Sequence, residues 1–152
     1  MSRYLQNGNN IIRIIFLSLL LFFYGNAFAD YQTILKKARQ GNAESQYTLD
    51  TMYELGEGVA EDDKEAFKWF SLAASQGYAK AQNNLGYMYD LGEGVAQDNL
   101  RAYMWKSLAA AQGEIDAAEQ RDELASRMTK DQLEKAQKMA RDCKARNYKS
   151  CE

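Results

Sequence analysis

The chain has 152 residues, of which 46% are hydrophobic and 26% charged, a composition that suits one globular domain and leaves little room for two. It contains no histidine, which excludes a Ser-His-Asp triad, a Cys-His pair and every histidine-ligated metal site. Its formal charge of −2 lacks the excess of Lys and Arg that nonspecific nucleic-acid binding requires, so we expect no nucleic-acid partner. We also expect no metal and no cofactor.

Residues 1–29 have the composition of an export signal. Arg3 and Arg13 give a basic start, residues 14–23 are almost wholly apolar, and small residues surround a predicted cleavage after Ala29. The alternative is an uncleaved membrane anchor, but an apolar run of about ten residues is half of the roughly 20 that a spanning helix needs. We therefore predict a periplasmic or secreted mature chain, with no stable membrane insertion once the signal is removed.

Residues 30–42 are predicted to form a partial unit consisting of one helix. Ile34, Leu35 and Ala38 recur at helical spacing and form its apolar face. Gly41 follows as the expected stop.

Residues 43–78 and 79–114 are near-duplicates that share 20 identities in 36 columns without a gap. A fixed period of a few tens of residues is typical of a solenoid, whose units stack because none can cover its own apolar face. Each unit is predicted to form two helices joined by a glycine-containing link, with an aspartate capping the second helix and a tryptophan on its packing face. The structural positions are Gly56, Gly58, Trp69, Gly77, Gly92, Gly94, Asp98, Trp105 and Gly113.

The second unit closely resembles the Sel-one-like repeat family, a branch of the tetratricopeptide-like helical solenoids. The family pattern is met by Ala79, Ala81, Gln82, Leu85, Gly86, Met88, Tyr89, Gly92, Gly94, Val95, Asp98, Ala102, Trp105, Ala109, Ala110 and Gly113. The expected fold is all-α, an α/α solenoid of stacked antiparallel hairpins that form a tetratricopeptide-like superhelix of about seven helices. The first unit departs at Ser45 and at Asp50, where the family has a close-packing glycine. That aspartate is expected to point to solvent if the preceding unit is incomplete.

Residues 115–152 are predicted to form a C-terminal capping helix pair with a clipped tail. Thr129 and Gln132 make a capping box that opens the final helix. In an oxidising compartment, Cys143 and Cys151 are expected to bond to each other. The alternative, a redox or metal-binding dithiol, is disfavoured because the spacing is not C-x-x-C.

The predicted function is binding of a protein or peptide partner. The first helices of successive pairs line the inner wall of such an array, and the resemblance implies a non-enzymatic adaptor. The candidate partner-binding residues on this wall are Tyr47, Thr51, Glu54, Asn83, Tyr87 and Asp90. The alternative is that these are ordinary solvated side chains, and the oligomeric state is left open.

A second hypothesis is a cell-wall protein that binds muropeptides or β-lactams, with or without weak hydrolase activity. The resemblance raises it, because some cysteine-rich relatives are linked to penicillin binding. Neither repeat of this chain contains a cysteine, and no serine begins an S-x-x-K motif. We therefore expect no enzymatic activity and no catalytic residues.

Overall fold

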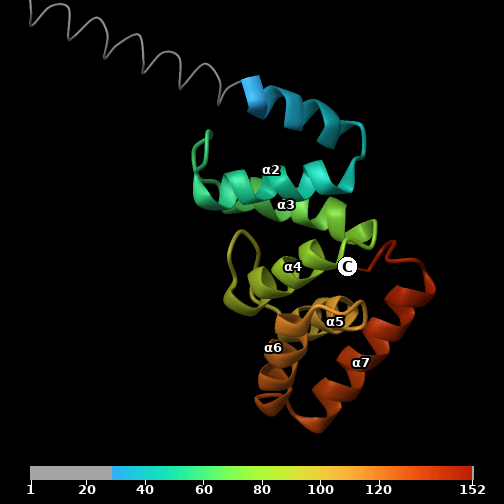
Figure 1. The fold of residues 1–152 in the computed structure, drawn as a ribbon. Helices are drawn as coiled ribbons and strands as arrows, with labels where there is room; N and C mark the ends of the chain where they lie inside the picture. The colour runs from blue at the N-terminus through green and yellow to red at the C-terminus, as the bar shows by residue number, and fades with distance from the viewer. Residues whose placement is uncertain (1–28, 152) are drawn as a thin grey trace, which may run out of the picture.

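The computed structural model describes residues 29–151, which are all-helical and contain no strand (Figure 1). The predicted export signal lies outside these residues except for Ala29. The described helices, seven in number as expected, are residues 29–39, α2 Ala43–Leu55, α3 Asp63–Ser75, α4 Ala79–Leu91, α5 Asn99–Ala110, α6 Ile115–Ser126 and α7 Lys130–Ala145.

The helices are piled in chain order as antiparallel hairpins (Figure 1). Within each repeat the first helix packs on the second, α2 on α3 and α4 on α5, and the repeats join where α3 packs on α4. Beyond the second repeat, α6 and α7 each pack on α5, and α7 runs back along the stack. The helical solenoid expected from the repeat is confirmed.

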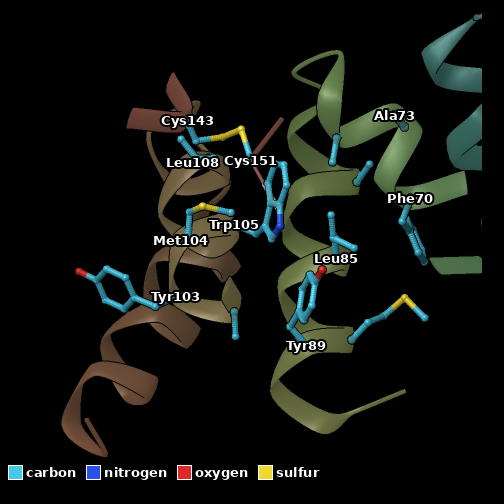
Figure 2. Close-up of a cluster of buried hydrophobic side chains, with 14 of the residues drawn as sticks. Phe70, Ala73, Leu85, Tyr89, Tyr103, Met104, Trp105, Leu108, Cys143 and Cys151 are labelled. Atoms are coloured by element: carbon cyan, nitrogen blue, oxygen red, sulfur yellow. A yellow bond between two sulfur atoms is a disulfide. The ribbon is translucent and has the colours of Figure 1, made fainter. Parts of the chain in front are cut away.

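Two groups of apolar side chains hold the stack together. The main core extends from α3 to the C-terminal tail, and Figure 2 shows Phe70 of α3, Leu85 of α4 and Trp105 of α5 inside it. A smaller cluster joins Leu35 and Ala38 to Leu49 of α2, with Trp69 packed against it. The fully buried alanines of α3 and α5 let neighbouring helices approach closely, so that the large side chains fill the remaining space.

The links between paired helices are alike in the two repeats. Gly92 ends α4 in the left-handed conformation, with φ of 80°, and its N–H donates to the Met88 carbonyl oxygen. The Asp98 side chain then accepts from the N–H groups of Leu100 and Arg101 at 2.9 and 3.0 Å. Because these bonds satisfy the exposed amides of α5, the chain reverses over a short link.

Gly94 also brings the two repeats together. Its φ is 66°, and a Cβ added there would overlap the carbonyl oxygen of Asp63 at the start of α3. The absent side chain therefore permits contact between the link of one repeat and the backbone of the other.

A ladder of glutamines fixes the register of the stack. Gln46 donates from Nε2 to the Ala38 carbonyl oxygen at 3.0 Å, and Gln82 donates to that of Ala74 at 3.2 Å. Their own Oε1 atoms accept from Gln76 and Gln112 respectively, each at 2.7 Å. These buried amides are paired only when adjacent units are correctly aligned, so the ladder favours one register.

The expectation that Asp50 points to solvent is wrong, because its side chain is fully buried. Gly86, the equivalent residue of the second repeat, faces Ala102 and Lys106 of α5, so this position faces the partner helix of its own hairpin. Completeness of the preceding unit therefore does not affect its exposure. Burial raises the pKa of Asp50 to about 9, while a hydrogen bond from the Thr51 hydroxyl opposes the shift.

The predicted disulfide between Cys143 and Cys151 is confirmed. It closes a tail that packs the ring of Tyr148 against Gly77, where a Cβ would lie 2.9 Å from the ring. The end of the chain is thus in contact with the turn between the two repeats.

Candidate partner-binding wall

The first helices of the three successive pairs are α2, α4 and α6, and we call the face that they form the inner wall. Three of the candidate residues come from α2. The half-buried ring of Tyr47 packs on Phe70 and Tyr78 with ring centroids 6.1 and 5.2 Å away, so it supports the stack as well as the wall. Thr51 donates to the Tyr47 carbonyl oxygen at 3.0 Å.

Glu54, the third candidate from α2, is half-buried close to other acidic groups. Burial raises its pKa first, and the negative charges of Glu93 and Asp63 raise it further. A cationic group bound at this point would relieve that repulsion.

The remaining candidates come from α4. Asn83 is half-buried, and its Oδ1 is enclosed without a hydrogen-bond partner. Tyr87 is 43% exposed, which makes it the most accessible aromatic residue of the wall. Asp90 lies one helical turn further along.

Tyr87 and Asp90 share a cavity of about 430 Å³, which we call the inner cavity. Its other lining residues come from the end of α4, the following link, α5 and α6: Leu91, Gln97, Lys106, Gln120, Glu123 and Arg127. Tyr47, Thr51, Glu54 and Asn83 do not line it. The structure therefore brings two of the six predicted residues together.

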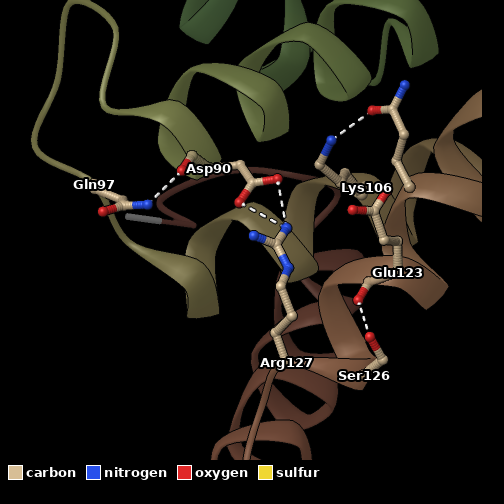
Figure 3. Close-up of polar contacts among 7 residues, drawn as sticks. Asp90, Gln97, Lys106, Glu123, Ser126 and Arg127 are labelled. Atoms are coloured by element: carbon tan, nitrogen blue, oxygen red, sulfur yellow. Dashed lines mark hydrogen bonds and ion pairs between the residues drawn. The ribbon is translucent and has the colours of Figure 1, made fainter.

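An ion pair crosses the inner cavity from α6 to α4. One Arg127 guanidinium nitrogen lies 3.3 Å from both carboxylate oxygens of Asp90, as Figure 3 shows. The Asp90 carbonyl oxygen also accepts from Gln97 Nε2 at 2.6 Å. Asp90 is therefore held from two sides, whereas the Arg127 side chain stays half exposed.

A buried lysine forms the floor of the inner cavity. Lys106 is only 1% exposed, and its Nζ donates to Gln120 Oε1 at 2.5 Å and lies 5.6 Å from the centre of the Tyr87 ring. Burial lowers its pKa, opposed by the charges of Asp90 and Glu123 and assisted by that of Arg127. A buried ammonium is costly to desolvate, so Lys106 is a candidate functional residue of the inner cavity.

Six residues that line the cavity were missed at the sequence level: Leu91, Gln97, Lys106, Gln120, Glu123 and Arg127. Two signals were present. Lys106 aligns with Phe70 of the first repeat, so a charge stands at an apolar core position. Glu123 stands 36 positions after Tyr87, so the repeat period places it on the inner wall.

The structural positions lie as follows. Trp105 is 2% exposed in the main core, whereas Trp69 is half-buried against the smaller cluster. Asp98 caps α5, and Gly56, Gly58, Gly77, Gly92, Gly94 and Gly113 all have positive φ.

A second cavity, of about 600 Å³, lies on another face. It is mostly apolar and is lined by α3, by Trp105 and by the tail at Tyr148 and Cys151. None of the six candidate residues contributes to it.

Neither a metal site nor a membrane span is found in the described part of the chain. Across residues 29–151 no three Cys, Asp or Glu side chains are grouped so as to hold a metal ion. Over the same residues, no helix has the length and apolar character needed to cross a bilayer.

The Sel1 repeat family model matches residues 43–78 and 79–114. A Sel1 repeat protein from Oxalobacter formigenes is 37% identical, with a TM-score of 0.58 over 59% of this chain and 68% of its own. The chain belongs to the Sel1 repeat family. Sel1 repeat proteins are generally protein-interaction scaffolds.

A longer Sel1-like protein has a similar fold. It is a protective antigen present in uropathogenic Escherichia coli strains that displays an SLR fold, 27% identical with a TM-score of 0.73. The match covers 78% of this chain but 26% of the antigen, so this chain spans about a quarter of that protein's length. No curated protein matches the sequence.

Proposed function

We propose that this Sel1 repeat protein is a non-enzymatic, exported adaptor that binds a peptide segment of another protein along its inner wall. The observation that carries the proposal is the inner cavity, where the 43%-exposed ring of Tyr87 stands beside polar groups from three helices. An accessible aromatic ring next to adaptable hydrogen-bonding groups is the composition that protein-binding surfaces favour.

Export is proposed on two grounds. The disulfide between Cys143 and Cys151 is a bond that persists in oxidising compartments. Residues 1–29 have the composition of a cleavable signal. Mass spectrometry of the mature protein tests this directly, since cleavage after Ala29 gives a chain that begins at Asp30.

Site-specific photo-crosslinking in intact cells tests the adaptor proposal. A photoreactive amino acid at Thr51, on the inner wall, is expected to crosslink one discrete partner. The same group at Lys138, on the exposed face of α7, serves as the matched control and is expected to give no such product.

Replacing Tyr87 by alanine in the Thr51 crosslinking variant is expected to reduce the product strongly, because the exposed ring contributes contact area without supporting the core. Circular dichroism checks that helicity is retained. Equal crosslinking from Thr51 and Lys138, or a product indifferent to Tyr87→Ala, would place the binding surface elsewhere.

A further inference from the structure

Lys106 is a buried cation that forms no ion pair with any residue in the described part of the chain. Its single hydrogen bond goes to the neutral amide oxygen of Gln120, although an ammonium has three donors. None of the ion pairs formed within residues 29–151 includes it. A buried charge in a folded protein is normally paired, whereas the two carboxylates of the inner cavity, Asp90 and Glu123, attract Lys106 without forming an ion pair with it.

Packing alone does not explain the lysine. At the same position of the first repeat, Phe70 is fully buried and fills the space with apolar atoms. Lys106 instead passes across Gly86, where a Cβ would lie 2.8 Å from the lysine Cγ. The glycine therefore admits the lysine stem from α5 to the inner wall, whereas the first repeat has Asp50 and Phe70 at these two positions.

The carboxylates of the inner cavity leave the ammonium available. Asp90 is bound by Arg127 through both oxygens. Glu123 is exposed on α6, and Figure 3 shows it near Lys106, with which it forms no ion pair. Its solvated charge weakens the attraction of the cavity for an incoming anion but does not neutralise Lys106 by direct contact.

We propose that the Lys106 ammonium binds a glutamate or aspartate side chain of a peptide lying along the inner wall, in the place now held by Gln120 Oε1. This inference rests on the proposed adaptor function and specifies the chemistry of the partner. The lysine belongs to α5, behind the wall, so a side chain entering the cavity approaches it more closely than a peptide main chain does. The Tyr87 ring lines the path of entry.

Short peptides that differ in one group test the proposal on the full-length protein. The probes are acetyl-Ala-Glu-Ala-amide, its glutamine analogue, and acetyl-Ala-Ala-Ala with a free C-terminal carboxylate. In an NMR titration, the glutamate peptide is expected to shift the Tyr87 and Gln120 signals saturably and to bind at least about tenfold more tightly than the other two.

Three variants change the charges around Lys106: two are expected to weaken binding of the glutamate peptide and one to strengthen it. Gln120→Glu supplies an internal carboxylate to Lys106 and is expected to weaken binding of the glutamate peptide at least about tenfold while preserving the fold. Lys106→Met removes the charge at similar volume and is expected to do the same. Glu123→Gln removes a competing negative charge and is expected to strengthen binding by about two- to fivefold. Lys80→Met, an exposed lysine of α4, is the matched control and is expected to leave binding unchanged.

Equal affinity for the glutamate and glutamine peptides, or unchanged binding by Gln120→Glu, would overturn the assignment to Lys106. Preference for the free C-terminus would overturn the assignment to an acidic side chain. These failures are distinct from failure of the adaptor proposal, because crosslinking from Thr51 and its loss in Tyr87→Ala do not depend on a carboxylate.

Discussion

The two aligned tryptophans have different surroundings despite their equivalent positions. Trp105 lies within the main core, whereas Trp69 lies against the smaller cluster and is half-buried. The indole nitrogen of each is enclosed without a hydrogen-bond partner. The ring area, rather than the polar group, is therefore the stabilising part of each side chain.

Trp105→Ala is expected to lower the free energy of unfolding by about 3–5 kcal/mol, because it leaves a large void in the main core. Trp105→Phe is expected to cost less, since a ring remains and an unpaired buried N–H is removed. Trp69→Ala is expected to lower the free energy of unfolding by less than Trp105→Ala does, because the Trp69 ring is already partly solvated. Urea unfolding followed by circular dichroism measures all three, and an unaffected Trp105→Ala variant would contradict the assignment of this residue to the core.

Asp50 makes stability depend on pH. Its pKa is about 9 in the folded chain, against an ordinary value of 3.8, so the folded state keeps a proton that the unfolded state releases. Stability from this group is therefore fully present below about pH 4 and is lost as pH rises toward 9, by up to about 1.4 kcal/mol per pH unit. Glu54, whose pKa is also raised, acts in the same direction.

Asp50→Asn is expected to flatten this dependence, because the amide carries no titrating proton. The gain in unfolding free energy relative to the unmodified protein should be larger at pH 8 than at pH 5. Urea unfolding at both pH values measures it, with Glu57→Gln, at an exposed link residue, as the control. Parallel pH profiles for Asp50→Asn and the unmodified chain would show that this carboxylate is ionised when folded.

At the scale of the helices, the links determine how closely successive repeats approach. Gly94 and Gly113 both have positive φ, of 66° and 97°, but only Gly94 faces neighbouring backbone. Nothing lies within 4 Å of a Cβ built at Gly113. A substitution at Gly113 therefore measures only the free-energy cost of left-handed backbone, whereas one at Gly94 also measures the cost of disturbing the contact between repeats.

Gly113→Ala is expected to lower the free energy of unfolding by about 1–2 kcal/mol, the cost of placing a Cβ in left-handed backbone. Gly94→Ala should lose at least about 1 kcal/mol more, because the methyl group also pushes the link away from α3. Thermal unfolding of the two variants compares them. Equal losses would mean that the link can move away from Asp63 at no cost.

The caps of two helices followed from local residues. Asp98 caps α5, and the predicted capping box of Thr129 and Gln132 opens α7 with both of its hydrogen bonds present. These features depend on residues a few positions apart, which the sequence displays directly. The orientation of Asp50 was predicted wrongly because it depends on the facing helix, which the linear sequence does not show.

At the scale of the whole molecule, the near-duplicate units predicted the solenoid but only part of the candidate site. Tyr87 and Asp90 were placed on the inner wall by their repeat position. The other side of their cavity comes from α6, where the match to the repeat pattern is lost after Gly113. Comparison of the two repeats with each other identifies only the residues that the repeats contribute to the cavity. The residues contributed by α6 are missed because α6 lies outside both repeats.

Because Tyr148 contacts Gly77, inserting a further repeat has different consequences at the two ends of this array. A duplicated unit inserted before residue 43 would leave the tail, the second repeat and their shared boundary intact. An extra unit inserted after residue 114 would carry α7 and its disulfide one step away from that turn, and Tyr148 would meet a different junction. Lengthening before residue 43 would thus keep the contacts of the tail, and residues 29–39 would pack on the inserted unit in place of α2.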